Sequence, residues 1–552
     1  MKNTFRYILR YSIDPAFNAN ERIDELVRFC QDAKIEEVMF QIMPEELSTG
    51  YPTDKELEQW LELAIRTQEA LDDAGIDMSV QPWCTTYHNF RGRHLRPGQD
   101  FRRLVGENGT EHPIAVCPLS ANWQEYLSRY FALFAEALQP NVIWIEDDFR
   151  LHNHDIHLTG WGGCFCEEHL KLFSKRIGQT VTREELIEKL LAKGTPHPWR
   201  DEWFNLNWET MKTPAEKIAA AVKKLSPHTR LALMTSNPDQ HSIEGRKWNE
   251  LADILRNEQS FIIRPHLYPY TEEAAIHNPP MVARHTIATI ERPLEIHPEL
   301  ECGPRCGLYS KSSRFIGWQC FYSALFGSDG ITINCLDLLG NGTLYFPELS
   351  QQLREQKQQL NALKAIGIDD RNSIGVNVLF HPDIARTMDG NDSATLGALI
   401  NPTAIWPQTL SILGISWRMA MDIDDIPAGQ PVAVGGQTLR AFSDEAISML
   451  LSMPLLLDAL SVEILLERGF GSLIGINDAT WQLLDDTAYS YETVEETDAS
   501  VYGIPHPRMT AQRAAGRMLE MSLGDKTETI TTIRKADGKM CWPGMVTYRN
   551  EQ

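Results

Sequence analysis

Positive charge is scarce in this chain. Its 552 residues include 52 Lys and Arg against 75 Asp and Glu, which gives a net charge of -23. This excess of acid argues against nucleic acids and anionic membranes as partners, because both are negatively charged themselves. Long apolar runs are also missing: no segment approaches the roughly 18 apolar residues that a membrane-spanning helix needs. The first residues, "MKNTFRYILRYSIDP", lack the apolar core of a secretory signal.

Cysteine is sparse as well. The chain has 10 cysteines, too few for its length to form a small disulfide-bonded scaffold, so we expect a reducing, cytoplasmic location. The apolar fraction of 43% is ordinary for a globular protein. A length of 552 residues exceeds what one hydrophobic core normally supports, so two or three domains are expected.

Short apolar runs alternate with longer amphipathic segments over the first part of the chain. The amphipathic segments have the spacing of helices, and one of them ends at Gly75, a residue type common at helix C-termini. A glycine-rich first turn, typical of a doubly wound sheet, is absent. Strand–helix alternation of this length predicts a (β/α)8 TIM barrel over residues 1–370. The expected strands are residues 5–11, 36–44, 77–83, 141–148, 231–237, 261–269, 295–301 and 330–337.

Two further domains are expected after the barrel. Alternation resumes at "RNSIGVNVLFHP", which predicts a flavodoxin-like (glutamine-amidotransferase-like) α/β domain over residues 371–505. Short alternating runs predict a small β domain, complete or partial, over residues 506–552. An amidotransferase or peptidase would need a nucleophilic Cys or a G-x-S-x-G elbow. Cysteine is absent between Cys335 and Cys541 and no such elbow occurs, so we interpret the α/β domain as structural.

The expected barrel strands end in polar and aromatic residues. Catalytic groups of TIM barrels lie at the C-terminal ends of the strands, so these side chains should meet on one face and form a pocket suited to a polyol. Besides the acids discussed next, the expected substrate-binding residues are Arg10, Gln41, Trp83, His88, Asp147, Arg150, Asn237, His266, Tyr268, Glu299 and Asp337.

Acids at the ends of the fourth and seventh strands form the strongest candidate pair. Glycoside hydrolysis needs two carboxylates that flank the bond, one protonated and one that attacks or activates water. In the fourth run, strand alternation places Glu146 and Asp148 on one face; we prefer Asp148 as acid/base, with Glu146 as its rival. In the seventh run we prefer Glu301, the acid nearest the mouth, as the second carboxylate. Alternatives are a solvated acidic loop for "EDD" and a structural Glu301–Arg305 ion pair.

Soft metal ligands follow the acids in the chain. Cys164, Cys166 and His169 form C-x-C-x-x-H, and Cys117 is a fourth candidate upstream. Thiolates with an imidazole suit a closed, tetrahedral and therefore structural zinc site, which the chemistry itself does not need. The alternative is a set of reduced, buried cysteines. We expect Cys302 and Cys306 to pack in the core, and a catalytic metal at "HNHDIH" is the weaker interpretation.

These motifs resemble clan-A glycoside hydrolases with a β-galactosidase-type trimerisation domain, namely family 42 β-galactosidases and family 164 β-mannosidases. The cluster of Cys117, Cys164, Cys166 and His169 is similar to the family 42 zinc cluster, although the last ligand there is usually Cys. "PELECGP" resembles the segment that carries the nucleophile, which maps onto Glu301, and residues 454–476 resemble the trimerisation domain. The fourth strand departs from the family, because it lacks Asn-Glu.

The resemblance implies a retaining exo-β-glycosidase that acts as a homotrimer on a small sugar or an oligosaccharide. Two other functions stay open at this point. One is a sugar-binding protein without catalytic activity, which retention of both carboxylates argues against. The other is a zinc-dependent hydrolase, in which removal of the metal would abolish activity without unfolding the chain.

Overall fold

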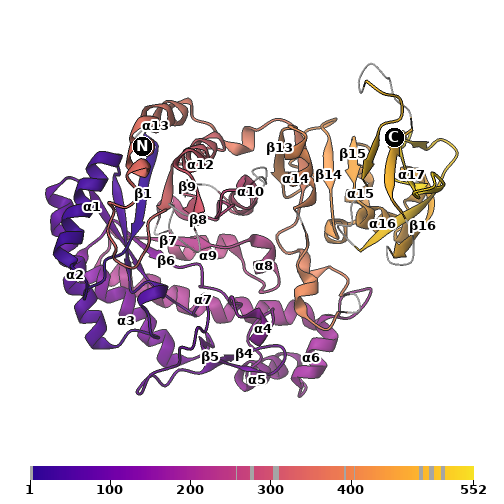
Figure 1. Ribbon diagram of the computed structural model, residues 1–552. Helices are drawn as coiled ribbons and strands as arrows, with labels where there is room; N and C mark the ends of the chain where they lie inside the picture. Colours follow the sequence, from indigo (N-terminus) through magenta and orange to yellow (C-terminus); the bar gives the residue numbers. More distant parts are fainter. Residues whose placement is uncertain are drawn as a thin grey trace. The chain divides into compact units, whose positions relative to one another are not determined.

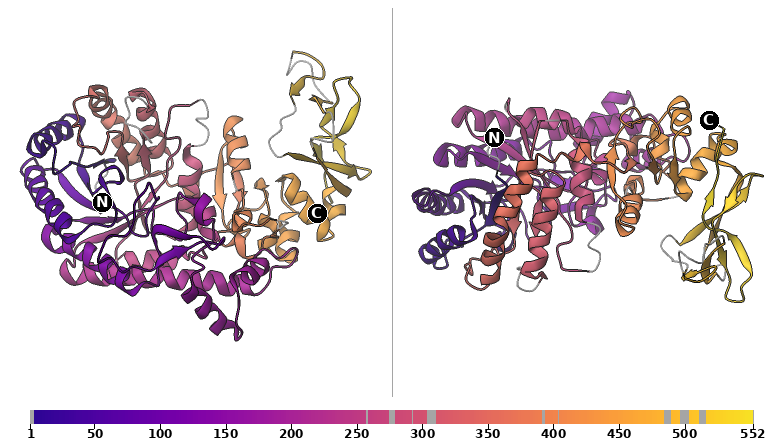
Figure 2. Two further views of the ribbon diagram at one scale, coloured as in Figure 1. Left: turned by 60° about the horizontal axis from the view of Figure 1, so that its bottom comes forward. Right: turned by 90° about the horizontal axis from the view of Figure 1, so that it is seen from above.

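The computed structural model describes residues 4–256, 258–273, 279–291, 293–302, 310–390, 393–402, 404–483, 489–495, 503–510 and 516–551 (Figures 1 and 2). The chain forms two compact units. The first contains Met1–Ile374, Ala385–Ile400 and Pro407–Met419, and the second contains Gly375–Ile384, Asn401–Trp406 and Ala420–Gln552.

The first unit contains a closed parallel β-barrel. Its sheet has the order β10-β11-β1-β2-β3-β6-β7-β8-β9. β9 and β10 are two halves of the seventh expected strand, and His266 forms a parallel bridge with Glu299, which closes the sheet into a barrel. The eight expected strands and the TIM-barrel fold are therefore confirmed. The strands are β1 (Arg6–Tyr11), β2 (Glu37–Ile42), β3 (Asp77–Pro82), β6 (Val142–Ile145), β7 (Arg230–Thr235), β8 (Phe261–Pro265), β9 (Leu294–Ile296), β10 (Glu299–Glu301) and β11 (Gly330–Asn334).

Amphipathic helices lie outside the barrel (Figure 1). Their apolar faces pack on the outer surface of the strands and form the main hydrophobic core. Local signals start and stop them: Thr53 and Glu56 form a capping box at the start of α2, and Gly75 just after its end has φ of +71°. The large helices are α1 (Ala19–Ala33), α2 (Asp54–Asp73), α3 (Ala121–Leu138), α7 (Trp199–Leu225), α9 (Trp248–Leu255), α10 (Pro279–Thr289), α12 (Ser313–Leu325) and α13 (Pro347–Ile366).

Shorter elements of the first unit build the loops around the site. A hairpin pairs β4 (Arg103–Val105) with β5 (Glu111–Val116) in antiparallel fashion. The long connection between β6 and β7 carries α4 (Ile156–Thr159), α5 (Glu167–Ile177) and α6 (Arg183–Leu190) before α7, and α8 (Pro238–Ser242) follows β7.

The barrel interior has an apolar layer with a charged layer above it. The apolar layer is one buried cluster, whose members are Ile8, Met39, Val142, Trp144, Ala232, Met234 and Ile262. Side chains two residues apart on a strand share a face. The residues two positions further toward the C-terminal ends therefore point into the same interior, and they are Arg10, Gln41, Glu146 and Arg264.

The second unit begins as an α/β arrangement. β12 (Val376–Leu379), β14 (Val432–Val434) and β15 (Leu455–Leu457) are neighbouring parallel strands. Their apolar residues join those of α15 (Asp444–Leu450), α16 (Ala459–Glu467) and α17 (Gly471–Ile474) in a second core. The division between the units falls within α14 (Ile405–Ile412) and β13 (Trp417–Ala420). The flavodoxin-like type of this domain stays a prediction.

Antiparallel strands occupy the end of the second unit, from Ile476 onward. β16 carries few buried side chains, so its sequence shows little of the alternation that marks a strand. The strands are β16 (Ile476–Leu483) with β19 (Arg517–Leu523), then β18 (Arg508–Thr510), β17 (Tyr491–Val494), β21 (Thr531–Arg534) and β22 (Met540–Pro543), and β20 (Glu528–Thr529) with β23 (Val546–Thr547).

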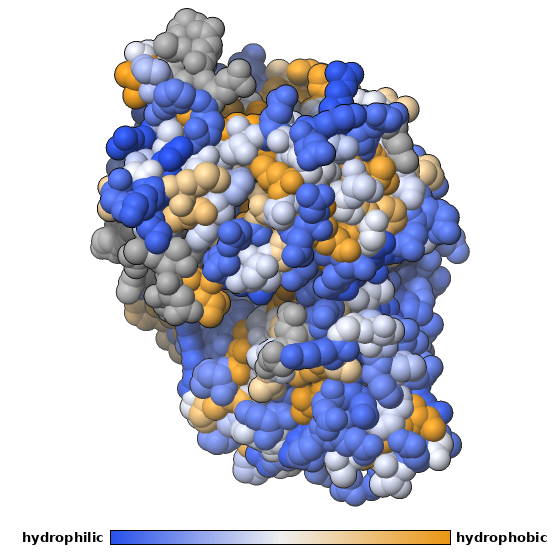
Figure 3. Space-filling view, turned by 90° about the vertical axis from the view of Figure 1, so that its right-hand side faces the viewer, coloured by the Kyte–Doolittle hydropathy of each residue, from blue (hydrophilic) through white to orange (hydrophobic). Residues whose placement is uncertain are grey.

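Apolar surface is dispersed on the face shown in Figure 3, where polar residues predominate and apolar ones form small separate groups. Among the described residues, none of the helices combines the length and apolar character needed to cross a lipid bilayer.

Candidate active site

Arg10 connects the acids of the fourth and seventh strands. Its Nη2 lies 2.8 Å from Glu146 Oε2, and its Nη1 lies 3.5 Å from Glu299 Oε1 and 3.9 Å from Glu301 Oε2. Because both ends of this bridge belong to one rigid guanidinium, Glu146 and Glu301 can be at most about 9 Å apart. The seventh-strand acids also share a face, as alternation predicts. The structure thus brings together the fourth-strand and seventh-strand acids.

A second arginine, Arg264, lies in the same layer. Its Nη1 forms an ion pair with Glu299 Oε1, and its Nη2 lies 3.5 Å from Glu146 Oε1. Arg264 was not among the expected site residues. The run "FIIRP" could have identified it, because a charged residue inside an apolar, buried strand needs an oppositely charged partner.

Asp147 is bound by two histidines and an arginine. His88 Nε2 contacts its Oδ1, His266 Nε2 lies 2.9 Å from its Oδ2, and Arg150 Nη1 lies 3.4 Å from the same Oδ2. His266 Nε2 also lies 3.5 Å from Glu299 Oε2. Through this shared nitrogen, the nearest oxygens of Asp147 and Glu299 can be at most about 6.4 Å apart.

Two of the four acids favour the protonated form. Burial raises the pKa of Glu301 well above its usual value, and the negative charge of Glu299 adds to this effect. Burial also raises the pKa of Glu146, with a further contribution from the charge of Asp147. The Glu301 side chain is 24% exposed and that of Glu146 is 2% exposed. Glu301 is therefore the acid that water and a substrate reach more easily.

The other two acids favour the ionised form. Burial opposes the ionisation of Glu299, but the charges of Arg264 and His266 outweigh it and lower its pKa to about 2. Burial likewise opposes the ionisation of Asp147, but the charges of Arg150 and His88 outweigh it and hold its pKa well below its usual range. One cluster thus combines acids with raised pKa values and acids with lowered pKa values, a pairing typical of acid–base sites.

Asp148 lies apart from this cluster. Its carboxylate accepts hydrogen bonds from the backbone N–H of Thr85 at 2.7 Å, the hydroxyl of Thr85 at 2.7 Å and the backbone N–H of Tyr87 at 2.8 Å. Alternation does not extend to Asp148, because β6 ends at Ile145 and the chain turns beyond it. The residue anchors the loop after β3, and Asp147, expected on the opposite face, joins the cluster instead.

Aromatic and amide groups line the same end of the barrel. The Trp83 indole stacks on His88 with ring centroids 4.7 Å apart. Tyr268 Oη lies 2.9 Å from His266 Nδ1, and Tyr270, which was not predicted, donates to Glu299 Oε2 at 2.8 Å. Both amide atoms of the buried Gln41 and the Trp83 indole N–H have no hydrogen-bond partner. Such groups are available to sugar hydroxyls or to water.

Two expected site residues make local contacts instead. Asn237 caps α8, because its side chain accepts the N–H of Asp239 at 3.2 Å. Asp337 accepts the backbone N–H of Leu339 at 2.9 Å and the side-chain amide of Asn341 at 3.2 Å, so it shapes the turn after β11. These contacts follow from the preference of Asn and Asp for caps and turns.

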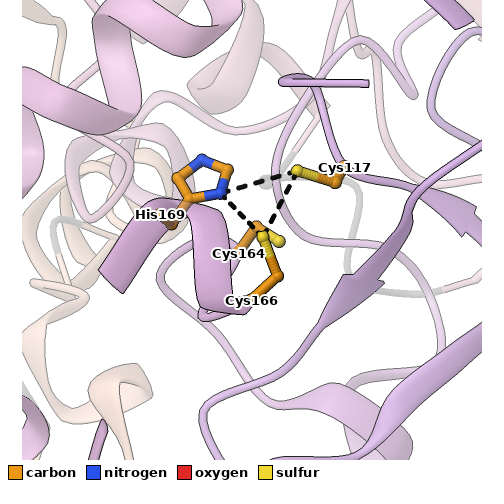
Figure 4. A group of neighbouring side chains, drawn as sticks. All are labelled: Cys117, Cys164, Cys166 and His169. Atoms are coloured by element: carbon orange, nitrogen blue, oxygen red, sulfur yellow. Dashed lines mark hydrogen bonds between the residues drawn. The ribbon is translucent and has the colours of Figure 1, made fainter. Parts of the chain in front are cut away.

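The four predicted metal ligands meet in one buried group (Figure 4). Cys117 follows β5, Cys164 and Cys166 precede α5, and His169 lies in its first turn. All four ligand atoms lie within 4.8 Å of one another. Gly162 and Gly163 have φ of +83° and +121°, which residues with a Cβ rarely adopt, and they turn the chain into this loop.

The spacing of these atoms fits tetrahedral zinc. Zn–S bonds of about 2.3 Å place two sulfurs about 3.8 Å apart, and Cys117 Sγ lies 3.7 Å from Cys166 Sγ. His169 Nδ1 lies 3.5 Å from Cys117 Sγ and 3.3 Å from Cys166 Sγ. The donor set could therefore hold a metal ion.

Other His-containing groups have explanations that need no metal. His152, from "HNHDIH", meets His241 and Glu244. Glu244 accepts hydrogen bonds from the backbone N–H groups of Leu151 and His152, and it also contacts both imidazoles. His88, Glu146 and Asp147 form a third group, where the neighbouring arginine charges oppose a cation. Cys306 lies outside the described residues.

Solved structures of other proteins share this fold, whereas sequence comparisons find no match. No protein-family model matches the chain, and neither does any curated protein. Among solved structures, a β-galactosidase from Rahnella sp. R3 superimposes with a TM-score of 0.60 at 12% identity, covering 97% of this chain and 83% of that one. Gan42B, a GH42 β-galactosidase from G. stearothermophilus, gives 0.59 at 11% identity over 97% and 82%.

An α-L-fucosidase isoenzyme 2 from Paenibacillus thiaminolyticus also superimposes, with a TM-score of 0.57 at 11% identity over 99% of this chain and 79% of that one. The predicted resemblance to family 42 of the clan-A glycoside hydrolases is thus confirmed at the level of the fold.

Proposed function

We propose that this protein is a retaining exo-β-glycosidase, with β-galactosidase-like or β-mannosidase-like specificity. The observation that carries the proposal is the convergence of acids from the fourth and seventh strands on Arg10 at the mouth of a TIM barrel. The partly exposed Glu301 and the unpartnered Gln41 and Trp83 atoms supply polar groups for a sugar ring. Release of nitrophenol from a panel of nitrophenyl glycosides tests this; release from none of them would favour a sugar-binding protein.

The electrostatics supports a division of roles that differs from the sequence-based one. A general acid must hold a proton near neutral pH, whereas a nucleophile must be ionised. The raised pKa of Glu301 suits the acid/base, and the lowered pKa of Asp147 suits the nucleophile. His88 and His266 keep Asp147 oriented. Glu301 as nucleophile with Glu146 as acid/base is the alternative.

The pH dependence of kcat/KM separates these assignments. With Glu301 as general acid, activity is full while Glu301 is protonated and falls as pH rises through its raised pKa. With Glu301 as nucleophile, activity rises through the same pKa instead. Asp147 stays ionised down to strongly acidic pH, because its pKa is lowered, so it adds no acid limb near neutrality. A falling limb that disappears in Glu301→Gln supports our assignment, and a rising limb that disappears contradicts it.

We also propose that Cys117, Cys164, Cys166 and His169 bind one structural zinc, which would tie the loop before α5 to the end of β5. Metal analysis should find about one zinc per chain, and chelation should lower the melting temperature. Cys166→Ser should lose the metal, whereas His169→Cys should keep it because sites with four cysteine ligands also bind zinc. Loss of activity on chelation with an unchanged melting temperature would point to a zinc-dependent hydrolase.

The resemblance to family 42 further supports a homotrimer as the assembly that we propose, and a mass measurement in solution tests it.

A further inference from the structure

Two thiols lie side by side directly behind Glu301. Cys302 follows β10 and Cys335 follows β11, and the backbone N–H of Cys302 donates to Asn334 O at 3.0 Å. Their sulfurs are 3.3 Å apart, and both residues are buried. Neighbouring strand positions lie about 5 Å apart, within the Cα separation that a disulfide spans. A disulfide between these two neighbouring positions is therefore sterically possible.

A cation and a hydrogen bond favour the thiolate of Cys302. The hydrogen bond with Cys335 and the charge of Lys311 together lower the pKa of the Cys302 thiol, although burial opposes this. Lys311 Nζ is held in place by Glu301 O and by Gln319 Oε1 at 2.7 Å. Thiolates beside a lysine are the cysteines that peroxides oxidise most readily.

We propose that Cys302 and Cys335 form a reversible redox modification site, whose oxidant is a small hydroperoxide and whose disulfide state impairs Glu301. The Cys302 thiolate attacks one peroxide oxygen, which forms an S–O bond, breaks the O–O bond and releases water from hydrogen peroxide after proton uptake. The Cys335 sulfur then attacks the Cys302 sulfur, its proton leaves with the hydroxyl group as a second water, and the S–S bond forms. Two thiols lose two electrons to the peroxide, and an external dithiol reverses the change.

The disulfide would act on Glu301 through the backbone. The sulfurs must approach from 3.3 Å to about 2.05 Å, which moves the residue next to Glu301 and disturbs the lysine bound to the Glu301 carbonyl. Misplacing a catalytic group by 1 Å can cost about 10²-fold in rate. The effect on activity rests on the proposed function, whereas formation of the disulfide does not.

Peptide mapping of the full-length protein tests the site. Wild-type protein treated with hydrogen peroxide should yield a Cys302–Cys335 linked peptide under non-reducing conditions, and dithiothreitol should remove it. Nitrophenyl glycoside hydrolysis should fall by about 10²-fold on oxidation and recover on reduction. Cys335→Ser should keep its activity in peroxide, whereas Cys30→Ser, which removes a buried thiol from α1, should respond like wild type.

Peptide mapping tests whether the disulfide forms, and the activity assay tests whether the disulfide affects hydrolysis. The proposed redox site would be wrong if the disulfides found join Cys302 to Cys306 or Cys335 to Cys320, or if no disulfide forms. If Cys335→Ser does not fold, Cys335→Ala is the second variant to test. A Cys302–Cys335 linked peptide in a protein whose hydrolysis rate is unchanged would show that the disulfide does not impair Glu301. A linked peptide in a protein that hydrolyses no glycoside in either state would keep the site and refute the proposed function.

Discussion

Glu301→Gln is expected to lower glycoside hydrolysis by about 10³-fold, the usual contribution of a positioned general acid. The fold should survive, because the neutral amide resembles the protonated acid that burial and Glu299 favour at this position. Hydrolysis rates with the full-length variant, together with its circular dichroism spectrum, check both parts. Glu58→Gln on the exposed face of α2 is the matched control and should keep wild-type activity.

The leaving group of the substrate shows which role Glu301 has. If Glu301 is the acid/base, a dinitrophenyl glycoside, whose leaving group needs no proton, should lose much less of its rate than an alkyl glycoside in glycosylation. Asp147→Asn should impair both substrates equally, because the nucleophile acts in every turnover. Equal losses for both substrates in Glu301→Gln, with a selective loss in Asp147→Asn, would reverse the roles. Wild-type turnover of Glu301→Gln would remove Glu301 from the chemistry.

Arg264→Met is expected to destabilise the barrel by about 3–5 kcal/mol, because it leaves buried carboxylates without their cation. Arg264 is buried and pairs with Glu299 and Glu146, and without it Arg10 and His266 would compensate these acids only in part. Adding Glu299→Gln should recover part of the loss, since it removes one of the unpaired charges. Urea denaturation followed by tryptophan fluorescence measures the change.

Arg256→Met supplies the control for this stability experiment. Arg256 pairs with Asp253 at 2.7 Å, but both side chains are partly exposed to solvent, so its loss should cost less than about 1 kcal/mol. An Arg264→Met midpoint equal to that of wild type would show that the carboxylates are compensated by other groups. Since the chain has two units, only the transition of the first unit is relevant.

The barrel could be predicted from the sequence because its signals are local. Each strand is a short apolar run, and helices such as α2 have amphipathic spacing and a capping box, formed there by Thr53 and Glu56. The position of β16 was harder to predict from the sequence, since a strand with few buried residues shows no clear apolar–polar alternation. Boundaries in the second unit were therefore harder to predict than the barrel strands.

Strand direction explains which of the predicted residues lie close together. Parallel strands all end on one face, so Arg10, Glu146, Glu299 and Glu301 could be expected to meet. Asp148 could not be oriented, because β6 ends three residues earlier and the turn that follows is shaped by contacts with Thr85 and Tyr87. Asn237 belongs to a helix cap, which no strand-end argument can reveal.

The sequence by itself determined which residue types stand at the strand ends and that Cys164, Cys166 and His169 are close enough along the chain to share a ligand site. Only the tertiary structure decided which acids have lowered pKa values, because the charges responsible come from Arg264, His88 and His266 on distant strands and loops. It alone also brought Cys335 to Cys302. Electrostatic energies depend on distance in space, and separation along the chain does not fix that distance.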